Sequence, residues 1–199
     1  MKKSERTQLT ISKIMEAAII EFGENGYSGG TVNNICKTGI NKGLIYHNFQ
    51  GKDDLYLACL NHSCSKLLDF LNPKACNMES YLKARMDFFS ENPKEARILF
   101  DALLSTPSHL SEEISKALKK FNDLNEKIYS DTLEGLILRK GISKEEATSY
   151  FHLMQTMLNG YFSNPTFQNT DMGQKVELHE KTVSKLLDYM LYGIAKEEF

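Results

Sequence analysis

Apolar residues recur every three or four positions along most of the chain, a spacing that places them on one face of an α-helix. In the first of these stripes, Ile11, Ile14, Ala18 and Phe22 follow one another at such steps. Runs of β-branched residues are few, and the chain contains only four prolines. The pattern therefore predicts an all-α fold without strands. The predicted helices cover residues 10–25, 32–37, 42–47, 52–71, 77–91, 93–105, 111–140, 143–162 and 172–196.

Capping residues and glycines mark the expected ends of these helices. Thr31 and Asn41 each precede a short helix and carry a side-chain oxygen that can accept from a free amide of the first turn. Ser143 begins a capping box, with a glutamate three residues later. Gly26 and Gly141 are expected to end the helices before them.

The two short helices at residues 32–37 and 42–47 are separated by a turn that contains Gly39, and longer helices flank the pair. This arrangement is typical of a helix-turn-helix, whose second helix enters the major groove of DNA. Short helix pairs also occur as purely structural hairpins in all-α proteins. The pattern alone therefore leaves both interpretations open.

A specific set of residues between positions 11 and 60 favours the DNA-binding interpretation. In order along the chain they are Ile14, Ala17, Ala18, Phe22, Gly26, Tyr27, Thr31, Val32, Ile35, Gly39, Gly43, Tyr46, Phe49, Lys52 and Leu55. On these residues the segment resembles the DNA-binding domain of the TetR family of transcriptional regulators, whereas beyond residue 60 only the helical layout and the length match. At Gly30, Cys36, Lys37, Thr38 and Asn48 the chain departs from the residues usual in that family, which leaves the preferred DNA sequence open.

The resemblance implies two domains. An N-terminal three-helix helix-turn-helix DNA-binding domain would occupy residues 1–50, and a C-terminal helical bundle for ligand binding and dimerisation would occupy residues 51–199. It also implies a repressor that leaves a palindromic operator when a small inducer binds.

The second short helix is the expected recognition helix. Ile45 and Phe49 are predicted to point inward, which leaves the polar side chains for DNA. Lys42 could reach a guanine edge or a phosphate, and the Tyr46 hydroxyl suits a phosphate. His47 could contact DNA or be a solvated surface residue. The expected DNA-contacting residues are Thr31, Asn41, Lys42, Gly43, Leu44, Tyr46, His47 and Lys52.

The charge distribution supports nucleic-acid binding only weakly. The whole chain has 24 Lys and Arg against 26 Asp and Glu, a net charge of -2, whereas residues 1–60 hold seven basic and six acidic residues. Lys52 begins a helix, where free amides favour an anion such as a DNA phosphate, although a solvated lysine is the alternative. Lys2, Lys3 and Arg6 are expected to form a basic arm ahead of the first helix, or else a frayed terminus.

The last two predicted helices carry broad apolar stripes, and the stripe over residues 143–162 is too wide for a single contact. The resemblance implies that these helices pair with their copies in a homodimer as a four-helix bundle, while a core within one chain is the alternative. The expected dimerisation residues are Tyr150, Phe151, Leu158, Gly160, Leu187, Met190, Leu191 and Ile194.

Aromatic and methionine side chains are frequent in the C-terminal part. The resemblance implies that they enclose a pocket for a small, largely apolar or aromatic inducer, although such residues are also ordinary core. The expected ligand-binding residues are Phe70, Phe88, Phe89, Phe100, Phe121, Met154, Met157 and Tyr161. Four acids, Asp87, Glu95, Asp101 and Glu134, could pair with a cationic ligand or be solvated.

The remaining chemistry excludes several classes of protein. No G-x-S-x-G, H-E-x-x-H, P-loop or dinucleotide motif occurs, so an enzyme is not expected. Cys59, His62 and Cys64 match no metal-ligand spacing, and neither a metal nor another cofactor is expected. Without an apolar signal segment or a run of ~18 apolar residues, the chain is expected to be cytoplasmic. A helical protein-interaction module and a redox-sensing regulator that uses Cys36 remain as alternatives.

Overall fold

The computed structural model describes residues 3–167 and 170–193, and over these ranges every element of regular secondary structure is a helix. The all-α prediction is thereby confirmed. The α-helices are α1 (Lys3–Gly29), α2 (Val32–Cys36), α3 (Lys42–Asn48), α4 (Lys52–Leu71), α5 (Met78–Glu91), α6 (Pro93–Leu104), α7 (Ser111–Glu134), α8 (Lys144–Phe162) and α9 (Met172–Tyr192), with short 3-10 turns at Ser108–Leu110 and Pro165–Phe167. No helix in the described ranges has the length and apolar character to cross a membrane.

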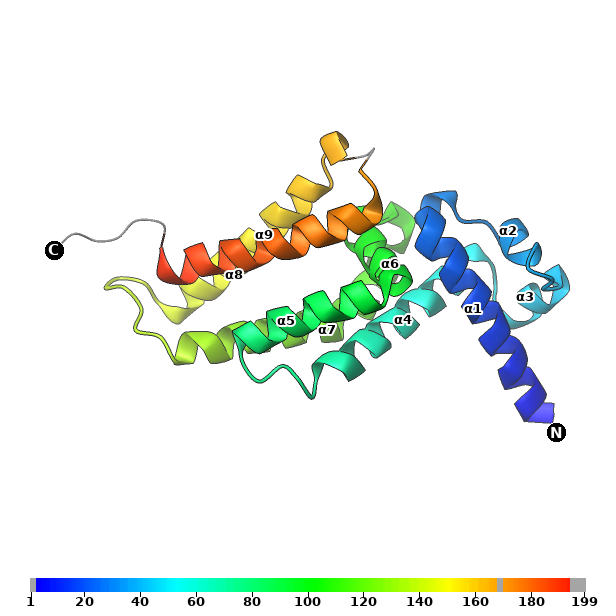
Figure 1. The fold of residues 1–199 in the computed structure, drawn as a ribbon, viewed down its shortest axis with the longest axis horizontal. Helices are drawn as coiled ribbons and strands as arrows, with labels where there is room; N and C mark the ends of the chain where they lie inside the picture. Colours follow the sequence, from blue (N-terminus) through cyan, green and yellow to red (C-terminus); the bar gives the residue numbers. More distant parts are fainter. Residues whose placement is uncertain (1–2, 168–169, 194–199) are drawn as a thin grey trace.

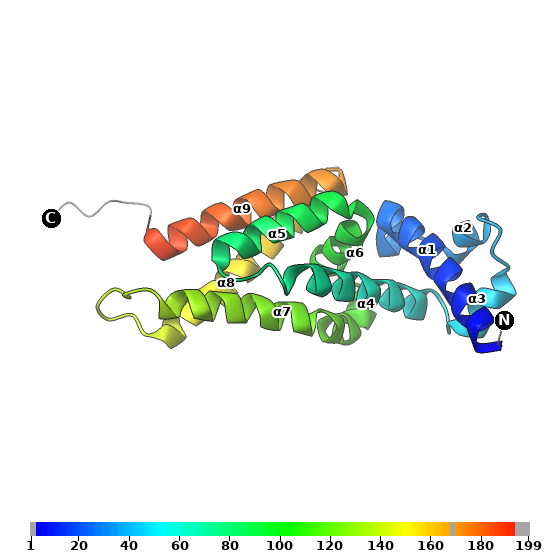
Figure 2. The same ribbon diagram turned by 60° about the horizontal axis from the view of Figure 1, so that its bottom comes forward.

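The helices form an elongated molecule with a small unit at one end (Figure 1). Helices α1, α2 and α3 make up this unit, and α4 leads from it into a bundle that contains the other helices. Within the bundle α5 and α7 run beside α4, and α8 packs against α9 (Figure 2). The short helix α6 contacts α1, α4 and α9, so it connects the small unit to the far side of the bundle.

The predicted caps are present. Thr31 Oγ1 accepts from the backbone N–H of Asn34 at 3.1 Å, and Asn41 Oδ1 accepts from that of Gly43 at 2.7 Å. Ser143 takes part in the expected capping box at the start of α8. These side chains satisfy amides that a helix leaves unpaired in its first turn, which fixes where α2, α3 and α8 begin.

Three helix boundaries were predicted wrongly. Helix α1 already begins at Lys3, so Arg6 lies within the helix rather than in an arm ahead of it. Helix α7 ends at Glu134 and does not continue to residue 140. Gly141, which was expected to end this helix, lies in the following loop with a positive φ of 90°. Helix α9 ends at Tyr192 rather than near residue 196. Lys2 and Ile194 lie outside the described residues, as does the side chain of Lys3.

Close packing joins the small unit to α6. A Cβ added at Gly23 of α1 would lie 2.9 Å from the Cβ of Lys94, so a larger residue would push the two helices apart. Gly26 has a φ of 64° and interrupts the helical geometry of α1, as the sequence suggested. This break turns Tyr27 toward α4, where its ring packs edge-on against Tyr56 with 5.0 Å between centroids.

Candidate DNA-binding surface and regulatory core

The recognition helix α3 is attached to the core by one side and exposed on the other. Ile45 is fully buried, and Phe49, directly after the helix, is buried as well, as predicted. Tyr46 is 52% exposed and Leu44 is 45% exposed. Asn41, Lys42, Gly43 and His47 are also exposed. The small unit therefore presents a polar helix face with an aromatic hydroxyl to solvent.

Two residues beside this face were missing from the expected DNA-contacting set. Asn33 accepts a hydrogen bond from Lys42 Nζ at 3.0 Å, and Lys37 Nζ donates to Asn34 Oδ1 at 2.9 Å. Lys37, directly after α2, thus adds a second exposed ammonium to the helix-turn-helix. The sequence signal for these contacts was the pair Asn33 and Asn34, which lies on the face of α2 opposite Val32 and Ile35.

Lys52, the first residue of α4, is half-buried rather than freely solvated. Its ammonium lies 4.4 Å from the centroid of the Tyr27 ring. The Tyr27 hydroxyl donates to Asp53 Oδ1 at 2.6 Å, and burial together with this carboxylate raises the pKa of Tyr27 to about 12. The position of Lys52 is therefore fixed by an aromatic contact close to the helix-turn-helix.

The wide apolar stripe of α8 divides into two faces. Phe151, Leu158 and Met154 are buried within the chain. Met157 and Tyr161 point away from them and are 64% and 60% exposed. Two expectations were therefore wrong. Met157 and Tyr161 do not lie in the expected ligand-binding core, because they face solvent. Phe151 and Leu158 are buried within the chain and cannot contact a second copy. The exposed apolar residues of α8 are Tyr150, Leu153, Met157 and Tyr161.

Helix α9 divides in the same way. Leu187 is buried against the chain's own core, so it too is removed from the expected dimer surface, while Met190 and Leu191 are half-buried. The exposed apolar residues of α9 are Leu178, Tyr189 and Tyr192. Gly160 of α8 is exposed, and a Cβ added there would meet nothing within 4 Å.

The aromatic residues expected to line a ligand pocket mostly contact one another. Phe88 packs edge-on against both Phe70 and Phe89, with centroid separations of 5.5 and 5.6 Å, and Phe89 meets Phe100 at 5.3 Å. Phe121 lies beneath the guanidinium of Arg85, whose Cζ is 5.4 Å from the ring centroid. Most of these rings therefore fill the core, and among them only Phe89 borders an open groove.

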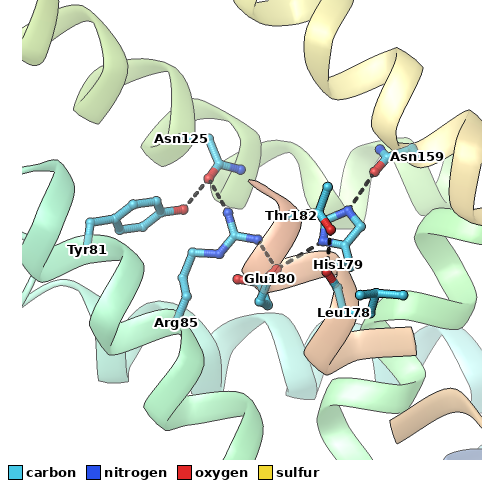
Figure 3. Close-up of polar contacts among 8 residues, drawn as sticks. All are labelled: Tyr81, Arg85, Asn125, Asn159, Leu178, His179, Glu180 and Thr182. Atoms are coloured by element: carbon cyan, nitrogen blue, oxygen red, sulfur yellow. Dashed lines mark hydrogen bonds and ion pairs between the residues drawn. The ribbon is translucent and has the colours of Figure 1, made fainter. Parts of the chain in front are cut away.

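A buried polar network crosses the bundle (Figure 3), and it meets these rings where His179 packs edge-on against Phe100. Arg85 of α5 donates from Nη2 to Glu180 Oε1 of α9 at 2.6 Å and from Nη1 to Asn125 Oδ1 of α7 at 3.3 Å. Tyr81 also donates to Asn125, and His179 lies within hydrogen-bond distance of Glu180 Oε1, at 3.1 Å. The network continues to α8, because the other ring nitrogen of His179 lies 3.2 Å from the side-chain oxygen of Asn159.

The ion pair at the centre of this network is charged on both sides. Burial favours the neutral form of Glu180, but Arg85 and His179 outweigh it and hold the pKa of that carboxyl below its usual value. Burial would likewise lower the pKa of Arg85, yet the facing carboxylate raises it. Neither residue was among the site residues expected from the sequence. The signal was present in α5, where Arg85 falls within the buried stripe formed by Tyr81, Ala84 and Phe88.

Two hollows adjoin the network. The smaller one, next to Arg85 and Met154, has a volume of about 10 Å³, which suits a single water molecule. The larger one is a groove of about 360 Å³ between α5 and α9, lined by Phe89 and Glu180 among others. We call it the α5/α9 groove. Among the expected ligand-binding residues, only Phe89 and Met154 line either hollow.

The four acids considered for a cationic ligand lie elsewhere. Asp101 is buried between α1 and α4, Glu95 is paired with Lys66, and Asp87 and Glu134 are exposed. None of the four lines either hollow. The acids that line the larger hollow are Glu177 and Glu180, and neither was among the four.

The cysteines differ in accessibility. Burial raises the pKa of the Cys59 and Cys64 thiols to about 12, so neither forms a thiolate at neutral pH. Cys36 is half-buried and Cys76 is exposed. A redox-sensing role would therefore have to use one of the latter two.

Two family models match the chain. The model described as bacterial regulatory proteins, tetR family, matches residues 14–59, and the tetracyclin repressor-like C-terminal domain matches residues 75–191. The first covers the helix-turn-helix with its flanking helices, and the second covers most of the bundle.

Curated relatives include two transcriptional regulators. The biofilm operon icaADBC HTH-type negative transcriptional regulator IcaR of Staphylococcus epidermidis is 26% identical over 114 residues, which are 55% of this chain and 62% of that protein. The HTH-type transcriptional repressor SCO4008 of Streptomyces coelicolor is 27% identical over 94 residues, which are 47% of this chain and 49% of that protein. The chain thus matches less than two thirds of the length of either relative.

Solved structures show the same fold. FadR from Bacillus subtilis in complex with stearoyl-CoA has a TM-score of 0.65 at 18% identity, and the match covers 93% of this chain and 100% of that one. FadR from Bacillus halodurans, a fatty acid degradation regulator, has a TM-score of 0.62 at 16% identity with the same coverage. Since the C-terminal family model alone spans more than half of the sequence, the chain belongs to the TetR family of DNA-binding transcriptional regulators, which are not enzymes.

Proposed function

We propose that this protein is a repressor that binds a palindromic operator as a homodimer and is released by a small ligand with a largely apolar or aromatic body. The observation that carries the proposal is the recognition helix α3, which buries Ile45 and exposes Lys42 and Tyr46. A helix held by one side, with donors on the other, suits phosphate and base-edge contacts in a major groove. Residues 1–50 form the DNA-binding domain, and residues 51–199 form the domain that binds the ligand and dimerises.

The exposed apolar faces of α8 and α9 support the homodimer. Tyr150, Leu153, Met157 and Tyr161 line one side of α8, and large apolar residues exposed in this number are typical of an interface between proteins. Two such faces related by a two-fold axis would form a four-helix bundle. The dimer would then present two recognition helices to two successive major grooves, which is why a palindromic site is expected.

The names of the relatives support repression, and a groove in the helical bundle supports release by a ligand. IcaR is named a negative regulator and SCO4008 a repressor, and the FadR from Bacillus subtilis was solved with stearoyl-CoA. For this chain the α5/α9 groove offers the space for a ligand. Helix α6 contacts both α9 and α1, so a ligand that binds better to the conformation unable to bind DNA would shift the recognition helices.

A reporter assay tests this direction of control. The operator, obtained by selection from random duplex DNA, is placed across the start site of a reporter promoter. Expression of the chain should lower the reporter signal, and expression of a Lys42→Ala, Tyr46→Phe double variant should not. An increase in the signal with the unaltered chain would make it an activator and contradict the proposal.

A further inference from the structure

A buried carboxylate is among the groups that line the α5/α9 groove. Its volume of about 360 Å³ lies within the range of small-molecule sites. The walls are mainly apolar, with Met86 and Phe89 from α5, Pro93 from the start of α6 and Val176 from α9. Glu180 also lines the groove, although its side chain is only 3% exposed.

The two oxygens of this carboxylate are used differently. Glu180 Oε1 accepts from Arg85 Nη2 and faces His179 Nδ1. Glu180 Oε2 is buried and accepts no hydrogen bond within the part of the chain that the structure describes. A carboxylate oxygen that is buried without a hydrogen-bond donor is energetically unfavourable. A ligand that brings an N–H donor to this oxygen therefore gains more binding free energy than an apolar ligand would.

The charges around the groove favour a cation over an anion. At its rim Lys181 donates to Glu177 Oε1 at 2.6 Å, so this exposed lysine is already paired. Arg85 neutralises Glu180 from the side of Oε1 and donates from Nη1 to Asn125. Its Nε is buried and has no hydrogen-bond partner within the described residues, but Arg85 does not line the groove. A carboxylate ligand would therefore meet the two glutamates without a free basic partner among the lining residues.

We propose that the α5/α9 groove binds a protonated primary amine with an apolar body, whose ammonium donates to Glu180 Oε2 while its body packs against Met86, Phe89 and Val176. This inference rests on the proposed function, since it names the site and the chemical class of the releasing ligand. The groove and the exposed apolar face of α9 lie on different sides of that helix. Val176 and Glu180 follow one another at a step of four, whereas Leu178 and Tyr189 belong to the other face. A second copy on that face would leave the groove open.

Calorimetric titration of the full chain at pH 7 with three matched probes tests the proposal. Phenethylamine, phenethyl alcohol and phenylacetate share an aromatic body and differ in the polar group. A charge-assisted hydrogen bond to Glu180 predicts that the amine binds roughly tenfold or more tightly than the alcohol and the acid. Equal affinity of the amine and the alcohol, or the absence of saturable amine binding, would overturn the proposal.

Three variants locate the site. Glu180→Gln should reduce amine affinity to about that of the alcohol. Because this change disturbs a buried ion pair, Met86→Trp at an exposed position of the groove provides a second test and should weaken binding of the amine at least roughly tenfold. Lys83→Trp, also exposed on α5 but outside the groove, is the matched control and should bind the amine as the unaltered chain does. Unchanged amine affinity in Met86→Trp would contradict the placement.

The titrations contain no DNA, so the two proposals can fail separately. Selective amine binding by a folded chain that selects no operator would uphold the groove and refute the proposed repressor. A chain that selects a palindrome but does not distinguish the amine from the alcohol would refute the groove and leave the repressor standing.

Discussion

The backbone N–H of Tyr27 donates to Asp101 Oδ2 over 2.8 Å, and this bond joins the end of α1 to α6. The hydroxyl of Tyr56 on α4 donates to the same oxygen at 3.0 Å. A Cβ added at Gly26, the residue before Tyr27, would lie 2.9 Å from Asp101 Oδ1. One buried carboxylate therefore connects α1 of the helix-turn-helix unit, α4 and α6.

Substitutions of Asp101 should show how much its hydrogen bonds, as distinct from its charge, contribute to the free energy of unfolding. Asp101→Ala leaves the donors of Tyr27 and Tyr56 unpaired and should lower the free energy of unfolding by about 1–3 kcal/mol. Asp101→Asn keeps an acceptor oxygen and should lower it by less. Urea denaturation of the two variants measures the difference, and equal stabilities would contradict the role given to these bonds.

The same residue predicts a pH dependence. Burial raises the pKa of Asp101 more than the bonds from Tyr27 and Tyr56 lower it. The folded state then holds the proton more tightly than the unfolded state, so this group's contribution to stability falls as pH rises from about 3.9 through the raised pKa. Asp101→Asn lacks this titration. Its stability relative to the unaltered chain should increase with pH in that window and stay constant above it.

The Arg85–Glu180 pair should be more sensitive to losing one partner than to losing both. Arg85→Met leaves an unpaired buried carboxylate and should lower the free energy of unfolding by about 3–5 kcal/mol. The double variant Arg85→Met, Glu180→Met removes both charges and should lose less. Chemical denaturation at pH 7 compares them, and a double variant less stable than the single one would show that the pair is net stabilising.

Lys42→Ala should weaken operator binding while leaving the dimer intact. If the ammonium contacts DNA, the loss should be about 1–3 kcal/mol of binding free energy, and a phosphate contact would also reduce the salt dependence by about one unit of log–log slope. Fluorescence anisotropy over a series of salt concentrations measures both quantities. Lys83→Ala on α5 is the control. Unchanged affinity of Lys42→Ala near physiological salt would remove this residue from the DNA-binding surface.

Met157→Glu should produce monomers, because it would bring a charge into the apolar face of α8 that we assign to the dimer. Thr156→Glu, one residue earlier and also exposed, points to the side of that face and should leave the dimer intact. Sedimentation equilibrium distinguishes the two. A dimeric Met157→Glu chain would place the interface elsewhere.

The sequence predicted the helix-turn-helix closely, because its signals are local. The caps Thr31 and Asn41 and the inward positions of Ile45 and Phe49 depend on neighbouring residues, and each lies where the pattern indicated. Helix α4 begins and ends at the predicted residues.

The bundle was harder to interpret from the sequence. The apolar spacing of α8 indicates that residues such as Phe151 and Met157 share a helix, but the packing of α6, α7 and α9 against it decides which of them is buried. The Arg85–Glu180 pair joins residues that are 95 positions apart, and no local pattern connects them. Glu180, the buried acid among the residues that line the α5/α9 groove, could therefore not be identified from the sequence.

Selection of bound duplexes from a random DNA library, at a salt concentration near physiological and with the mass of the protein measured alongside, tests the central claim most directly. The account predicts an enriched palindrome whose half-sites lie about one helical turn apart, bound by a dimer. A folded dimer that enriches no sequence would contradict it.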